Sequence, residues 1–320
     1  MPMPEPTAAA LSDCLRAPSA ADETADVQAW MARWVPLANR GLPPMALALR
    51  GGHAADRLGW AFAAGYQAAL RALVPTLPAD ALAAFCVTEE GGNRPRDIHT
   101  TLTPSPGGGY TLSGAKRWTT LGPQGAILLV TARLAASDDA ARPRLKVARV
   151  RIGQPGVAIT PMPPTPFVPE VPHARVAFTE VTLTDGDLLP GDGYARCVKP
   201  FRTLEDLYVA AAVLAWLAGT AHRRGWPHDF REGLAGALAL LAALADEPPE
   251  APATHLALAG ALQWAAELHR QADVLWARTP DDPAAQRWQR DRPLMNVAAS
   301  ARRLRAERAW EAFDGPAETP

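Results

Sequence analysis

The sequence predicts an α+β fold with an N-terminal helical segment at residues 1–80, a central antiparallel β-barrel at 81–192 and a C-terminal helical bundle at 193–320. Two observations support this prediction. Apolar residues recur at helical spacing in the first and last parts, whereas the middle part consists of short alternating runs separated by Gly and Pro. Repeated strands without helices between them are typical of an antiparallel barrel or sandwich. Flanking helices would then cover the faces that such a barrel leaves open.

The individual elements follow from the same patterns. Helices are predicted at 26–39 and 54–73, and the Ala- and Pro-rich start is expected to be frayed as far as residue 22. A chain reversal is expected at Gly114. In the last part, the stretch Thr203-Leu-Glu-Asp206 reads as an N-cap box. The predicted strands lie at 83–87, 99–103, 110–113, 126–133, 145–152, 157–161 and 175–183. The predicted C-terminal helices lie at 201–221, 230–245, 253–278 and 293–313.

Composition limits the partners and the compartment. The chain has 32 basic and 33 acidic residues, so no global field favours nucleic acid or a membrane. Its three cysteines, Cys14, Cys86 and Cys197, have no paired spacing and fit a reducing compartment. The start has no basic region followed by an apolar run, so no signal peptide is expected. We therefore expect a soluble cytoplasmic protein, and the scattered histidines predict no metal site.

Residue types alone indicate a ligand site at the ends of two predicted strands. Thr88, Trp118 and Thr120 combine an indole with two hydroxyl groups, which suits a planar heteroaromatic ligand. The alternative is that Trp118 is a core residue and both threonines are ordinary strand residues. The residue types leave the two interpretations open.

Three stretches in order resemble the middle domain of the acyl-CoA dehydrogenases. They are F-C-V-T-E-E-G-G-N-R at 85–94, Y-T-L-S-G-A-K-R-W-T-T at 110–120 and A-I-L-L-V-T-A-R at 126–133. The likeness continues through V-P-H-A-R-V-A-F-T-E-V-T-L at 171–183. It implies a flavoprotein oxidoreductase whose FAD ring is contacted by Val87, Thr88, Trp118 and Thr120. We expect Thr88, Trp118 and Thr120 around one cleft between the barrel and the C-terminal helices.

The chain departs from the family where the substrate binds. The family's G-S-D, which meets the acyl-CoA, is replaced by Asn93-Arg94-Pro95. Arg94 and Arg96 are candidate substrate-binding residues because a guanidinium can pair with an anionic group. They are equally well explained as solvated loop arginines. The family's R-x-x-F-G and Q-x-x-G-G segments, which hold the rest of FAD, are also missing.

The resemblance implies a catalytic base on the first C-terminal helix. The family's usual base position falls on Ala299, which has no acidic group. Some members carry the base in a segment like L-D-L-E-R-L, and T-L-E-D-L-Y at 203–208 matches it with Glu205 as the base. Asp206 would add a like charge and raise the pKa of Glu205. The alternative makes Glu205 a first-turn acid that is favoured by the helix dipole.

These observations predict α,β-oxidation of an acyl thioester with FAD, with Glu205 as the base and an unidentified electron acceptor. Two alternatives stay open. One is a flavin-dependent monooxygenase of the same fold, and the other is a non-catalytic subunit or binding protein that keeps the old site. The family is usually dimeric, and the wide apolar faces of the C-terminal helices predict a homodimer through that bundle.

Overall fold

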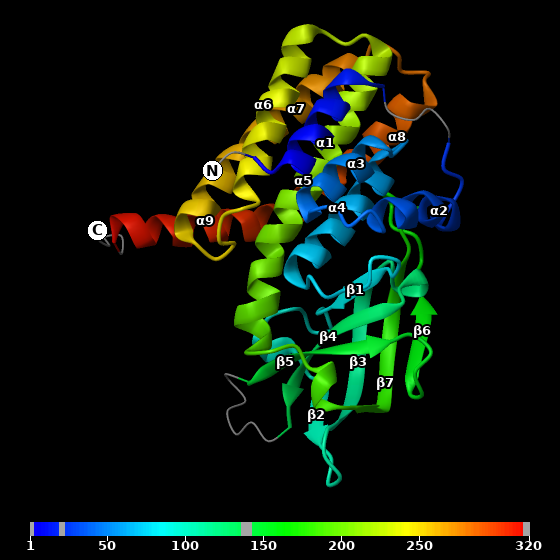
Figure 1. The fold of residues 1–320 in the computed structure, drawn as a ribbon, viewed down its shortest axis with the longest axis vertical. Coiled ribbons are helices and arrows are strands. Elements are labelled where there is room, and N and C mark those ends of the chain that lie inside the picture. Colours follow the sequence, from blue (N-terminus) through cyan, green and yellow to red (C-terminus); the bar gives the residue numbers. More distant parts are fainter. Residues whose placement is uncertain (1–2, 19–22, 136–142, 316–320) are drawn as a thin grey trace. The chain divides into compact units, whose positions relative to one another are not determined.

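The computed structural model describes residues 3–18, 23–135 and 143–315, and the chain divides into two compact units (Figure 1). The helical unit comprises Met1–Ala72, Thr165–Glu170 and Thr203–Pro320, and the sheet unit comprises Leu73–Pro164 and Val171–Arg202. Helices therefore occupy both ends of the chain and strands the middle. The predicted α+β class is confirmed.

The six predicted helices are present with shifted ends, whereas three further helices at residues 5–16, 44–53 and 283–291 were not predicted. α1 forms where fraying was expected, since Ala10 and Cys14 are buried and the Cys14 thiol donates to the Leu49 carbonyl, 3.6 Å away. The first four helices are α1 (Glu5–Arg16), α2 (Val27–Ala38), α3 (Pro44–His53) and α4 (Leu58–Leu73). The others are α5 (Lys199–Arg224), α6 (His228–Leu244), α7 (Pro252–Trp276), α8 (Pro283–Asp291) and α9 (Ala299–Asp314).

The sheet is mixed and open, so the predicted antiparallel barrel is wrong. Its strands are β1 (Ala83–Cys86), β2 (Thr101–Pro104), β3 (Tyr110–Thr120), β4 (Ile127–Leu134), β5 (Leu145–Arg151), β6 (Val157–Pro161) and β7 (His173–Leu183). They run in the order β1-β4-β2-β3-β7-β6, with β5 on the other edge of β4. β1 and β2 pair in parallel with consecutive stretches of β4, whereas the other pairs are antiparallel.

The difference arises because β3 does not turn at Gly114. Gly114 has φ +145° and lies at a bulge opposite β7, and a Cβ there would stand 2.6 Å from the Thr100 backbone. The strand therefore continues to Thr120, and the chain reverses only after Leu121, which is left-handed at φ +57°. An 11-residue strand carries the chain past β2 to the far end of the sheet. β4 consequently begins beside β1 and runs parallel to it.

The helical unit is built around close approach to α5. A Cβ on Gly52 of α3 would lie 2.1 Å from the Ala212 carbonyl oxygen of α5, so only glycine permits this contact. Trp30 stacks on both Trp34 and Trp60, with ring centroids 5.6 and 5.7 Å apart. These buried indoles fill the space between α2 and α4.

Helix α5, with the π-helical turn before it, is long and apolar enough to cross a bilayer. In the structure, 94% of its apolar window is buried. That burial is the pattern of a core helix, in agreement with the sequence-based interpretation of this region.

Ion pairs hold α9 to the helical unit, although Ala309 is its one fully buried residue among those described. Asp206 on α5 accepts hydrogen bonds from Arg302 Nε and Arg305 Nη2, both at 2.7 Å. Arg302 also donates to the Met295 carbonyl at 2.7 Å. Because Asp206 is only 7% exposed, its charge is compensated by these two guanidinium groups rather than by water.

A buried histidine makes the helical unit sensitive to acid. Burial, together with the nearby charges of Arg302 and Arg292, lowers the pKa of His269 from 6.5 to about 4. Its Nε2 has no hydrogen-bond partner among the described residues, and its ring lies edge-on to Trp288. The folded state therefore holds this imidazole neutral.

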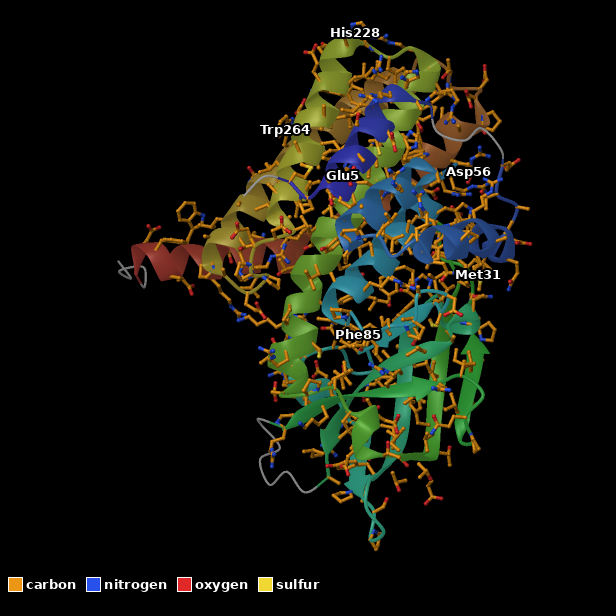
Figure 2. The ribbon with its side chains drawn as sticks, viewed as in Figure 1. Glu5, Met31, Asp56, Phe85, His228 and Trp264 are labelled. Carbon is orange, nitrogen blue, oxygen red and sulfur yellow. The ribbon has the colours of Figure 1, made fainter. Side chains whose placement is uncertain are left out.

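We expect the free energy of unfolding to fall as the pH drops from 6.5 toward 4, because the unfolded chain binds the proton that the folded chain excludes. The contribution of His269 is roughly 2–3 kcal/mol. Urea denaturation across this pH range should show a shallower dependence for His269→Gln. The exposed His228 provides the matched control (Figure 2), and an unchanged dependence in His269→Gln would contradict the assignment.

Candidate functional site

A loop in the sheet unit carries the first two candidate site residues. β1 and β2 lie on the same edge of β4, and residues 87–100 leave that edge and return to it. Glu89 closes the loop, since its carboxylate accepts the backbone N–H of His99 at 2.7 Å and of Thr100 at 3.0 Å. The backbone N–H of Arg117 on β3 donates to the Thr88 carbonyl at 2.9 Å. These bonds fix Val87 and Thr88 beside β3.

A buried ion pair anchors the same loop. Lys116 Nζ lies 2.6 Å from Glu89 Oε1 and 3.2 Å from the Val87 carbonyl, and the lysine side chain is fully buried. Burial alone would raise the pKa of Glu89, but Lys116 and the two backbone donors outweigh it and hold that pKa below 4.5. Burial lowers the pKa of Lys116, and the glutamate partly restores it. The ionised carboxylate therefore ties the loop to β3.

The end of β3 presents Trp118 outward. The pairing with β7 is irregular between Lys116 and Thr119, and Trp118 has φ +55°, a left-handed conformation that is uncommon for a bulky residue. Its indole is 44% exposed, whereas the next residue, Thr119, is fully buried and donates to Cys86 Sγ at 3.7 Å. The interpretation of Trp118 as a core residue is therefore wrong.

The structure brings three of the candidate ligand-binding residues to one corner of the sheet. Thr88 lies against the backbone of Arg117, next to Trp118, and Thr120 pairs with His173 on β7 two residues later. Neither the Thr88 nor the Thr120 side chain forms a hydrogen bond to a described residue, so both hydroxyl groups are available to a ligand. We call Val87, Thr88, Trp118 and Thr120 the Trp118 corner.

The sequence did not indicate the two residues that flank the indole. His173 lies edge-on to Trp118, with ring centroids 5.9 Å apart, and burial lowers its pKa below 6.5. The Arg117 guanidinium lies 5.3 Å from the indole centroid. The only available signal was position, since Arg117 directly precedes Trp118 and His173 begins the strand that pairs with Thr120.

The two candidate substrate-binding arginines lie in a tight turn of the same loop. The backbone N–H of Arg94 donates to Asp97 Oδ2 at 3.2 Å, and Arg96 Nε lies 3.7 Å from Asp97 Oδ1. The Arg96 side chain is 66% exposed. Their role in substrate binding stays a prediction.

The candidate base belongs to the helical unit. Because α5 begins at Lys199, Glu205 lies in the second turn, and the explanation of a first-turn acid favoured by the helix dipole is wrong. The N-cap role of Thr203 is also wrong, because this residue lies within α5. Asp206, whose like charge was expected to act on Glu205, is paired with two arginines that compensate this charge. Its effect on Glu205 stays a prediction. That Glu205 faces Trp118 stays a prediction.

The region where a FAD pyrophosphate segment was missing has a structural role here. Arg224 pairs with Asp282 and lies 4.2 Å from the centroid of the Trp276 ring. Trp226 packs edge-on against Phe230 and Trp276. These contacts hold α5, α6 and α7 together.

Comparisons with known proteins agree with this geometry. Residues 84–181 match the family model described as "Acyl-CoA dehydrogenase, middle domain". The fold is similar to that of butyryl-CoA dehydrogenase from Megasphaera elsdenii, with a TM-score of 0.72, 16% identity, and coverage of 97% of this chain and 99% of that one. A search of curated protein sequences finds no match.

Two further solved structures resemble the chain over nearly its full length. Glutaryl-CoA dehydrogenase from Mycobacterium smegmatis has a TM-score of 0.64 and 16% identity, and the match covers 98% of this chain and 94% of that one. A structure described as the FAD complex of PigA has a TM-score of 0.69 and 13% identity, with coverage of 97% and 98%. The resemblance inferred from the sequence is thereby confirmed: residues 84–181 match the middle domain of the acyl-CoA dehydrogenases, and the chain has the fold of the solved structures named above.

Proposed function

We propose that the protein is a flavin-dependent oxidoreductase that oxidises the α,β bond of an acyl thioester with FAD. The observation that supports this proposal most directly is the Trp118 corner. It offers an outward-facing indole and two hydroxyl groups that form no hydrogen bond to the described part of the chain, and a buried ion pair fixes the adjoining loop to β3. A flavin ring is planar and has hydrogen-bonding atoms along its edge, so the residues present fit it.

Each residue of the proposed site has a separate task. The Trp118 indole packs against the ring, and Thr88 and Thr120 donate or accept hydrogen bonds at its edge. Glu205 removes the proton from the substrate carbon next to the thioester carbonyl. A bound FAD would supply the acceptor for the hydride of the β carbon, and the electron pair left by the α proton would form the carbon–carbon double bond.

The cofactor part of the proposal predicts that Trp118→Ala weakens FAD binding. Loss of the aromatic contact should raise the Kd for FAD by about 10-fold, measured by flavin fluorescence during titration of the purified protein. Thr120→Val should also weaken binding because it removes a hydroxyl group. Thr179→Val, on the exposed side of β7, is the matched control. Unchanged affinity in both site variants would exclude the corner as the flavin site.

The catalytic part predicts that Glu205→Gln retains FAD but is reduced by acyl-CoA at least about 100-fold more slowly, because a general base contributes at that scale. Anaerobic loss of the oxidised-flavin absorbance measures the rate. Glu232→Gln, which removes an exposed carboxylate from α6, should behave as wild type. Reduction of Glu205→Gln at the wild-type rate would remove Glu205 from the mechanism.

One observation favours a second candidate, a non-catalytic subunit that binds a ligand through the same corner. The family's usual base position falls on Ala299, which here begins α9, and Arg224 is engaged in packing between helices. In this case FAD would bind and acyl-CoA would not reduce it. A flavin-dependent monooxygenase is distinguished by oxygen consumption with reduced flavin.

We further propose a cytoplasmic homodimer. Large apolar side chains are exposed on α6, α7 and α9, among them Trp264 (Figure 2), Trp310 and Phe313. Exposed apolar residues of this size favour burial against a partner. Light scattering at micromolar concentration should give twice the mass of the chain, and Trp310→Asp should shift it toward the monomer. A monomeric wild type would contradict the proposal.

A further inference from the structure

A hollow on the sheet unit adjoins the Trp118 corner and is not used by the proposed function. Its volume is about 250 Å³, and its walls come from β3, β6, β7 and the turn that contains Glu90. Ala115 pairs with Ala177 across β3 and β7, so the middle of this surface carries only methyl groups. The absence of larger side chains between the two strands leaves the space open.

Two guanidinium groups converge at the hollow on one carboxylate. Arg117 Nη1 lies 2.6 Å from Glu90 Oε1, and Arg175 Nη1 lies 3.2 Å from Glu90 Oε2. The Glu90 side chain is 70% exposed. Exposed ion pairs contribute little net stability, so a stronger anion can displace this carboxylate from both arginines.

The arginines are held in place, whereas the carboxylate can move away. Arg117 is fixed by its backbone hydrogen bond to the Thr88 carbonyl and by its contact with the Trp118 ring. Its Nε has no hydrogen-bond partner among the described residues, so Glu90 does not satisfy all of its donors. Thr160, which pairs with Arg175 on the neighbouring strand, adds a hydroxyl group to the wall. Two cations that share one displaceable anion match a ligand with more than one negative charge.

We propose that this hollow binds a phosphoryl group, with Arg117 and Arg175 as its ligands and Glu90 as the counter-ion that it displaces. Guanidinium groups bind phosphoryl oxygens through paired charge-assisted hydrogen bonds, and a phosphoryl group offers the two arginines more oxygens and more negative charge than one carboxylate. The phosphoryl group has two possible sources, the pyrophosphate of a dinucleotide and the phosphates of a thioester carrier such as coenzyme A. The binding itself does not depend on the proposed oxidation.

The test is calorimetric titration of the purified full chain with inorganic pyrophosphate at low ionic strength, where such contacts are least screened. Arg117→Gln and Arg175→Gln should each weaken binding about 10-fold. Glu90→Gln should strengthen it by roughly 3- to 10-fold, because the competing carboxylate is gone. Arg151→Gln and Glu180→Gln make the same charge changes at exposed positions of the sheet unit and should leave the affinity close to wild type.

Two pairs of ligands, each with and without phosphoryl groups, then identify which molecule supplies the phosphoryl group. If the dinucleotide supplies the phosphoryl group, the two arginine variants lose affinity for FAD but not for riboflavin. If the thioester carrier supplies it, they lose affinity for coenzyme A but not for pantetheine. Thermal melts of each variant report whether the fold is kept. No binding of pyrophosphate, or equal losses in Arg175→Gln and Arg151→Gln, would overturn the proposal.

Discussion

The bond between Lys116 and Glu89 is the constraint on which the candidate site depends. Residues 87–100 interrupt one edge of the sheet, and a loop of that length has no intrinsic reason to return to one position. The Glu89 carboxylate joins both ends of it, because it accepts two backbone N–H groups at the returning end and the Lys116 ammonium from β3. Removal of either partner would leave a buried charge without compensation, a change that typically costs about 3–5 kcal/mol. The position of Thr88 follows from this arrangement.

The lysine of this ion pair also lies at the start of the irregular part of β3, which carries residues of both the Trp118 corner and the charged hollow. Lys116 and Thr119 point into the core, and the irregular backbone between them turns Arg117 and Trp118 outward. Trp118 then belongs to the corner that suits a planar ring, and Arg117 belongs to the charged hollow beside it. One irregularity in β3 therefore places the Trp118 indole at the corner and the Arg117 guanidinium at the hollow beside it. The buried Lys116 directly precedes these two residues in the strand.

The sequence predicts local structure here better than it predicts topology. Short apolar or alternating runs between Gly and Pro located the seven strands of the described residues, and residues 157–161 were placed without error. The barrel prediction was wrong because repeated strands without helices between them need not be antiparallel, and β1 and β2 pair in parallel with β4. The turn predicted at Gly114 was also wrong, since the residue lies at a bulge beside Thr100. Long-range packing of this kind leaves no periodic signal. The frayed start failed for the same reason, since Cys14 is fixed by Leu49, far away in the sequence.

The candidate site was predictable only as far as the family motifs extend. Trp118 and Thr120 lie within a motif, and the structure places Trp118 outward as that resemblance implies. Charge compensation was not predictable, because the partners of Asp206 lie almost a hundred residues away on α9. His173 lies within the resembling stretch 171–183, but only its pairing with Thr120 in the structure places it beside the indole.

The central claim is that the corner fixed by Lys116 and Glu89 holds a flavin ring. The visible absorption spectrum of the purified protein, after incubation with FAD and removal of unbound cofactor, tests it most directly. The account predicts a retained flavin band in the wild type and its loss in Lys116→Met. This substitution removes the ammonium group that pairs with Glu89 and keeps the side chains of Trp118 and Thr120 in the sequence. A wild-type spectrum without flavin, or a full flavin band in a folded Lys116→Met protein, would contradict it.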